Sequence, residues 1–159
     1  MGGLSLTVVT IGKPGQPFVH AGIEHYRKRI SHHASLLLRD LKAVPLRKGI
    51  SIDEVRHREK ERILRVLEER QIRVILDEKG RSFRSSEFAQ WLRVNAQQGQ
   101  SRFVFVVGGP VGISPELLED SDMVLSVSPM TLSHDLTLLV LLEQIYRALA
   151  IFHNLPYPK

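Results

Sequence analysis

The chain alternates short apolar segments with amphipathic ones, and this alternation limits its fold more than any other feature of the sequence. Short runs rich in leucine, isoleucine and valine predict strands, and after each run apolar residues recur three or four positions apart, as they do along one side of a helix. Strands that are each followed by a helix predict an α/β fold, a mostly parallel sheet with helices on both faces. The predicted strands are Leu4–Ile11, Ser35–Val44, Ile72–Leu76, Phe103–Val107 and Met123–Val127.

Serine residues mark the beginnings of several predicted helices. Ser51, with Glu54 three residues later, forms a capping box that predicts a helix. Ser85 and Ser114 are predicted to cap two more, the second with a proline in its first turn. Further predicted features are the helices Phe18–Ile30 and Leu136–His153, the inward residues Ile52, Val55, Ile63, Val66 and Leu67 after Ser51, and the inward residues Phe88, Trp91 and Leu92 after Ser85.

The composition is typical of a globular protein. The 159 residues are 43% hydrophobic and 25% charged, so we expect one domain over residues 1–159. Cysteine is absent from the sequence, which excludes disulfides, thiolate zinc sites and cysteine nucleophiles. The richest apolar segment, Leu136–Leu142, is far shorter than a membrane-spanning helix. We therefore expect a soluble, cytoplasmic protein without a membrane partner.

The charge of the chain suggests a polyanionic partner. The formal net charge is +5, and basic residues concentrate in the first half, in the segments "HYRKRISHH" and "RHREKERILR". A basic surface attracts nucleic acid through the release of counterions. Acidic residues interleave with the basic ones in the second segment, a pattern that is also typical of a solvated helix face.

The loops after the predicted strands are the place to look for a site, because ligands of parallel sheets bind beyond the carboxyl ends of the strands. Four segments fall there: "GKPGQP", "LDEKG", "GGPVG" and "SVSPMTLSH". They offer main-chain groups, small hydroxyls, one imidazole and the acids Asp77 and Glu78. The glycines of "GGPVG" allow either a tight turn or the close approach of a ligand to the main chain.

Several chemistries are excluded by the residues at these loops. The segment "GGPVG" has neither a phosphate-binding lysine nor the spacing of a dinucleotide fingerprint, and no serine lies in a Gly-x-Ser-x-Gly elbow. The seven histidines include no pair three or four residues apart, so we expect no metal site. Main-chain groups and small side chains suit a cofactor that is itself reactive, and S-adenosylmethionine fits that description.

Five segments, "FVFVVGGPVG", "LSVSPMTLSH", "LLEQIYRALAI", "NLPYPK" and "LDEKGRSFRSSEFA", resemble the ribosomal RNA large subunit methyltransferase H family of the SPOUT superfamily. The resemblance runs essentially from end to end. It implies a homodimeric α/β domain with a trefoil knot near its carboxyl end. The implied activity is S-adenosylmethionine-dependent methylation of N3 of a pseudouridine in 23S rRNA, on the assembled ribosome.

The resemblance also implies roles for particular residues. His134 and Tyr157 are the implied catalytic residues, and the basic residues Arg27, Lys28 and Arg29 are expected to bind RNA phosphate. The last helix is expected to form the dimer face through Leu138, Leu141, Leu142, Ile145 and Leu149. The implied cofactor contacts are Leu76, Gly109, Ser128, Pro129, Met130, Thr131, Leu132 and Ser133.

Two positions depart from the family pattern. Leu138 stands where the family usually has arginine, and Pro158 stands where it usually has histidine. Both changes remove polar groups expected near the cofactor or the target base, which predicts slower methyl transfer with little change in cofactor affinity. Two other functions stay open at this point: an RNA- or ribosome-binding protein of the same fold without turnover, and a methyltransferase that acts on another RNA.

Overall fold

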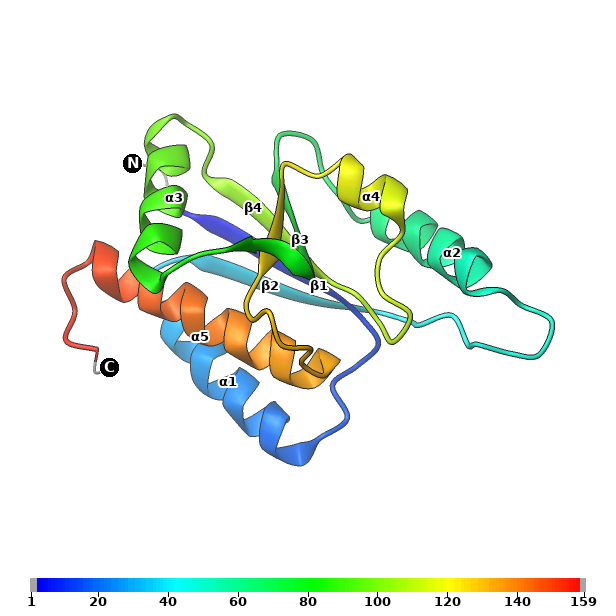
Figure 1. Ribbon diagram of the computed structural model, residues 1–159. Coiled ribbons are helices and arrows are strands. Elements are labelled where there is room, and N and C mark those ends of the chain that lie inside the picture. The colour runs from blue at the N-terminus through cyan, green and yellow to red at the C-terminus, as the bar shows by residue number, and fades with distance from the viewer. Residues whose placement is uncertain (1–2, 158–159) are drawn as a thin grey trace.

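The computed structural model describes residues 3–157 and contains a five-stranded sheet in the order β2-β1-β4-β3-β5, in which every pair of neighbours is parallel (Figure 1). The predicted strand–helix alternation is therefore confirmed. The strands are β1 Ser5–Ile11, β2 Ser35–Leu41, β3 Ile72–Ser82, β4 Arg102–Val107 and β5 Met123–Ser126. The helices are α1 Pro17–Ser31, α2 Ile52–Leu64, α3 Ser85–Gln97, α4 Pro115–Glu119 and α5 His134–Phe152.

Helices cover both faces of the sheet, as the sequence predicts. Side chains alternate between the two faces of a strand, so Phe103 and Phe105 of β4 join a large core together with α1, α3 and α5. Val104 and Val106 of the same strand face the other way, into a smaller core that includes Ile63 of α2 and residues of α4. Figure 1 shows α1 and α5 side by side on one face, with α2 and α4 on the other.

Two predicted strand boundaries are wrong by three residues or more. β2 ends at Leu41, three residues before the predicted end at Val44. β3 continues well beyond Leu76, because the polar residues that look like a loop still pair with β5 after a register irregularity between Leu76 and Arg81. Gly80 permits this pairing, since a Cβ atom there would lie 2.7 Å from the main chain of Val124.

Of the three predicted serine caps, two are confirmed and one is wrong. Ser51 and Ser114 accept hydrogen bonds from the main-chain N–H groups two or three residues into their helices, at 3.1 and 3.3 Å. Ser85 is not a cap: Arg84 occupies that position, and the Ser85 hydroxyl instead donates to Gln144 Oε1 at 2.6 Å. Ser133 caps α5, which therefore begins at His134.

Three expectations about helices also need correction, the first of which is Ile52, expected to face inward but 48% exposed. Val66 and Leu67 lie beyond the end of α2, although both still pack against the smaller core. The apolar residues of α5 are covered within the chain itself, because α5 packs on the sheet and on both α1 and α3. The inferred dimer face is therefore already buried: Leu138, Leu141, Leu142, Ile145 and Leu149 are each at most 3% exposed. Among the described residues, no helix has both the length and the apolar character needed to cross a membrane.

Candidate functional site

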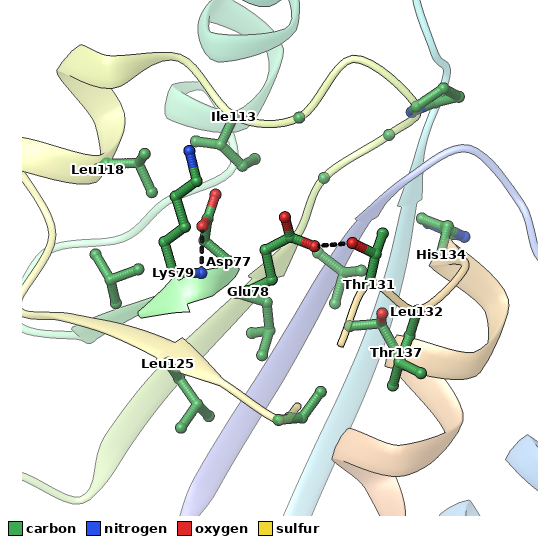
Figure 2. Close-up of a pocket in the computed structure, with 18 of the residues that line it drawn as sticks. Asp77, Glu78, Lys79, Ile113, Leu118, Leu125, Thr131, Leu132, His134 and Thr137 are labelled. Carbon is green, nitrogen blue, oxygen red and sulfur yellow. Dashed lines mark hydrogen bonds between the residues drawn. The ribbon is translucent and has the colours of Figure 1, made fainter. Parts of the chain in front are cut away.

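A cleft of about 970 Å³ opens at the carboxyl edge of the sheet, beyond β3, β4 and β5 and beside the first turn of α5 (Figure 2). This is the edge at which the sequence predicts a site. Pro129 does not line the cleft, although it belongs to the same loop as residues that do. Eight predicted site residues line it together: Leu76, Gly109, Ser128, Met130, Thr131, Leu132, Ser133 and His134.

The glycine loop after β4 forms one wall of the cleft, and its glycines are required by close packing. A Cβ atom on Gly108 would lie 2.8 Å from Ile113 Cδ1, and one on Gly109 would lie 3.0 Å from Ile11 Cγ2. Gly112 has a φ of +77°, a left-handed conformation that favours glycine. The side of Gly109 that a side chain would occupy thus faces β1, so substitution there disturbs the strand packing as well as the cleft.

The same loop is held from outside by α2. Arg56 Nε donates a hydrogen bond to the carbonyl oxygen of Val111 at 2.7 Å, and Arg56 itself lines the cleft. Nothing in the sequence pattern links position 56 to position 111, so this contact was not predictable. Through this contact α2, which packs on the smaller core, also supports the site.

The loop after β5 forms the opposite wall and presents main-chain donors. Its first turn is fixed internally, because Ser126 Oγ donates to the carbonyl oxygen of Ser128 at 2.8 Å, and Ser128 Oγ accepts from the N–H of Met130 at 3.0 Å. Within residues 3–157, no hydrogen-bond acceptor lies against the next three N–H groups, those of Thr131, Leu132 and Ser133. These groups are available to a ligand.

Glu78 links β3 to the loop after β5 across the cleft. Thr131 donates its hydroxyl hydrogen bond to the Glu78 carboxylate, which reaches it from the second half of β3 (Figure 2). Asp77 instead accepts from the N–H of Lys79 at 2.8 Å and so shapes the strand locally. Thr137, one turn into α5, also lines the cleft and is not among the predicted site residues, although its spacing of three residues from His134 places both on one side of the helix.

His134 begins α5 and lines the cleft with a side chain that is 17% exposed. Its Nδ1 lies 3.3 Å from Asp135 Oδ1, while its Nε2 is buried and has no hydrogen-bond partner among the described residues. The other Asp135 oxygen accepts from the N–H groups of Gly15 and Gln16, at 2.9 and 3.0 Å. Burial opposes the charged form of Asp135, but these hydrogen bonds and His134 outweigh it and lower the pKa of that carboxyl.

The other implied catalytic residue lies away from the cleft. Tyr157 Oη donates to Glu143 Oε1 at 3.2 Å and lies 3.4 Å from Tyr26 Oη, while the Arg147 guanidinium lies 4.4 Å from the centre of its ring. Burial and these neighbours raise the pKa of Tyr157. Since Glu143 follows His134 by nine residues, Tyr157 is anchored about 13 Å along α5 from the cleft.

The three basic residues expected to bind RNA lie on the second half of α1. Arg27 is exposed and forms an ion pair with Glu24, and Lys28 is exposed. The Arg29 guanidinium lies 5.4 Å from the centre of the Tyr146 ring, which is about 18 Å along α5 from His134. The structure thus does not bring these three residues to the cleft.

The two departures from the family pattern lie in different parts of the chain. Leu138 is 3% exposed and belongs to the large core, so it does not line the cleft. Pro158 lies outside the described residues. Over residues 3–157, no three histidine or acidic side chains come together in a group that could hold a metal ion.

Comparisons with known proteins match the chain over nearly its full length. Residues 4–158 match the family described as "Predicted SPOUT methyltransferase". The chain is 36% identical over 157 residues to the "Ribosomal RNA large subunit methyltransferase H" of Acetivibrio thermocellus, an alignment that covers 97% of this chain and 99% of the relative. It is 32% identical over 154 residues to the protein of the same name from Phocaeicola vulgatus, with 97% and 98% covered.

Proposed function

The chain belongs to the SPOUT methyltransferase family, and from that premise we propose that it transfers a methyl group from S-adenosylmethionine to N3 of a pseudouridine in 23S rRNA on the assembled ribosome. The observation that carries the proposal is the cleft at the carboxyl edge, which is lined by His134 and by a loop whose N–H groups at residues 131–133 have no acceptor among the described residues. The names of the relatives support ribosomal RNA of the large subunit as the substrate.

The residues of the cleft fit S-adenosylmethionine. A volume of about 970 Å³ is ample for a ligand of this size. The free N–H groups of residues 131–133 suit the ring nitrogens of adenine or a carboxylate, and the Glu78 carboxylate suits the positive charge of the cofactor. We therefore assign cofactor binding to seven of the eight predicted contacts, Leu76, Gly109, Ser128, Met130, Thr131, Leu132 and Ser133, with Pro129 shaping the loop between them.

When bound, the cofactor supplies a methyl group that is already activated by its sulfonium, so the chain has to position the target base and accept its N3 proton. We assign the proton to the imidazole of His134, which lines the cleft and whose Nε2 has no hydrogen-bond partner among residues 3–157. Asp135 holds the other ring nitrogen and is itself fixed by two main-chain N–H groups, so the imidazole is oriented before substrate arrives.

The test is methyl transfer by the purified protein to large ribosomal subunits that lack the modification, with the product located by mass spectrometry of the rRNA. Thr137→Trp places an indole in the cleft and is expected to weaken cofactor binding about tenfold or more, whereas Thr137→Val keeps the shape of the side chain and is the matched control. Cofactor binding without methyl transfer would favour the non-catalytic RNA-binding protein. A methylated product in another RNA would favour the methyltransferase with a different target.

We expect the departures at positions 138 and 158 to slow turnover. Relatives that carry arginine and histidine there should show faster single-turnover methylation at equal cofactor affinity. An equal rate would mean that the pocket of this chain is competent without those groups.

We also infer that two copies form a twofold dimer. Phe18 is 62% exposed and Leu136 is 38% exposed, and the first turns that carry them are tied together by the hydrogen bonds of Asp135 to Gly15 and Gln16. Large exposed apolar side chains that lie together mark contact surfaces. Light scattering should show a dimer for the native chain and a monomer for Phe18→Glu, and a native monomer would contradict the inference.

A trefoil knot near the carboxyl end remains part of this proposal. Its support is the family membership, together with two cleft loops, after β4 and β5, that meet beside the first turn of α5. Stretching the unfolded chain from its two ends provides the test, because a tightened knot leaves the extended length shorter than about 3.5 Å per residue. A full contour length would contradict the knot.

A further inference from the structure

The loop between β2 and α2, residues 42–51, carries an exposed pair of cations that neither the cleft nor the core uses. We call this loop the basic arm. The side chains of Arg47 and Lys48 are exposed, and neither forms an ion pair or a hydrogen bond with any residue from 3 to 157. Figure 1 shows the arm reaching well beyond the sheet, next to α2.

The basic arm is anchored at its base. Val44 is 7% exposed and donates its N–H to the buried carboxylate of Glu59 at 3.1 Å, and Arg62 donates a hydrogen bond to the carbonyl oxygen of Lys42. Its tip is a turn, closed by the N–H of Ile50 and the carbonyl oxygen of Arg47 at 3.1 Å. An anchored loop holds its cations in place at low entropic cost, which is what a binding surface requires.

The position of the arm relates it to the cleft. All five strands are parallel, so the loops that follow them leave from one edge of the sheet, and the arm follows β2 at that same edge. β2 and β4 are separated only by β1, which sets the base of the arm about 10 Å from the strand that leads into the glycine loop. Between them, Arg56 of α2 adds a further cation at the cleft itself.

The basic residues of α1 lie differently. Because α1 begins at the carboxyl edge and runs back across the sheet, Arg27 and Lys28 are about 15 Å from its start. Arg27 is also neutralised by Glu24, whereas no acidic side chain of residues 3–157 lies against Arg47 or Lys48. Thus α1 carries its basic residues away from the carboxyl edge, whereas the arm starts at that edge.

We propose that the basic arm binds the sugar–phosphate backbone of the substrate RNA next to the target base, with Arg47 and Lys48 contacting phosphates. This inference rests on the proposed function, because it takes the RNA that the cleft modifies as the occupant. An RNA strand that enters the cleft beside β4 has flanking phosphates within the reach of two long basic side chains. The charge, exposure and lack of partners at the tip fit that polyanion.

The test measures binding of the purified protein to unmodified large ribosomal subunits over a range of salt concentrations. Arg47→Gln/Lys48→Gln is expected to weaken binding about tenfold or more at 0.1 M salt and to reduce the slope of log affinity against log salt by about 1.5. Cofactor affinity, measured by calorimetry without RNA, should stay unchanged.

Two further variants remove the same charge elsewhere. Arg70→Gln/Arg93→Gln changes exposed residues that lie outside the arm, the cleft and α1, and it is expected to bind within about twofold of the native chain. Arg27→Gln/Lys28→Gln tests the rival surface on α1. If the native chain binds and the arm variant binds equally well, this inference alone is overturned. The same holds if only the α1 variant loses binding. A native chain that does not bind the subunits overturns both this inference and the proposed function.

Discussion

The two faces of the sheet differ in how they are built. On the face covered by α1, α3 and α5, rings of Phe88, Trp91, Phe103 and Phe105 pack against one another, with ring centres 5.6 to 6.5 Å apart. On the face covered by α2 and α4, the core is aliphatic and smaller, and the buried carboxylate of Glu59 lies beside it. Stability is therefore concentrated on the first face, while the second supplies the supports of the cleft loop and the basic arm.

The largest expected effect on stability comes from substituting two neighbouring residues of β4 that face the two different cores. Phe105 and Val106 are neighbours on β4, both fully buried, but they face opposite cores. Phe105→Ala should lower the free energy of unfolding by about 4 kcal/mol, and Val106→Ala by about 2 kcal/mol, because the lost apolar volume and the remaining cavity are larger for phenylalanine. Chemical denaturation measures both, and equal losses would show that the two cores contribute equally.

Glu59 tests whether a buried charge beside the smaller core lowers the stability of the folded chain. Burial raises the pKa of this carboxyl above its ordinary value, although the N–H of Val44 and the charge of Arg62 act in the opposite direction. The folded chain thus binds the proton more tightly than the unfolded chain. The stability that Glu59 contributes is present in full below the ordinary pKa and is lost as the pH rises through the raised pKa.

Glu59→Gln keeps an oxygen that can accept from the N–H of Val44 and removes the charge. We expect this variant to match the native chain near pH 4 and to be about 1 kcal/mol more stable at pH 7. Glu59→Ala, the control, should lose about 2 kcal/mol near pH 4, because it leaves the N–H of Val44 unpaired, and about 1 kcal/mol at pH 7, where the native chain has lost its own contribution. Thermal unfolding across this pH range measures the difference, and a native stability that rises with pH relative to Glu59→Gln would contradict the assignment.

Arg56 tests the link between the smaller core and the cleft. Arg56→Ala removes the hydrogen bond that holds Val111, so cofactor affinity should fall about fivefold while stability changes by less than about 1 kcal/mol. Arg58→Ala is the control, because within residues 3–157 that side chain forms only an exposed ion pair with Glu54. Calorimetry measures the affinity of both variants for S-adenosylmethionine. Equal affinities would show that α2 does not support the site through Arg56.

The smallest expected effect concerns the end of the chain on the larger-core side. Tyr157→Phe removes the hydrogen bond to Glu143 but keeps the ring against Arg147, so we expect a loss of about 1 kcal/mol in stability. Because Tyr157 is anchored far from His134, cofactor affinity and single-turnover methylation should change little. A loss of methylation of about tenfold or more at unchanged stability would instead support the catalytic role implied by the family resemblance.

Local patterns predicted most of the elements and the edge of the sheet that carries the cleft. They failed where pairing depends on a distant partner. The polar residues after Leu76 continue β3 only because β5 lies alongside and Gly80 allows close approach. The expectation that α5 would present an apolar dimer face failed for the same reason, since α1 and α3 cover Leu141 and its neighbours within one chain.

The candidate site was predictable to the extent that its groups follow strands. The loops after β4 and β5 and the residue His134 were all placed at the cleft correctly, because parallel strands end at one edge. Arg56, the contact of Glu78 with Thr131 and the unpartnered Nε2 of His134 could not be predicted, because each depends on side chains that are far apart in the sequence or on burial by several elements.

The sequence by itself determined the strand and helix periodicity, the family and the carboxyl-edge loops, because these depend on residue type and on neighbours a few positions away. Only the tertiary structure decided that the basic residues of α1 lie away from the cleft. Counting basic residues favours α1, where Arg27, Lys28 and Arg29 are consecutive, but the direction of α1 carries them away from the edge at which β2 leaves Arg47 and Lys48. Charge is a property of composition, whereas its distance from a site is set by the path of the chain.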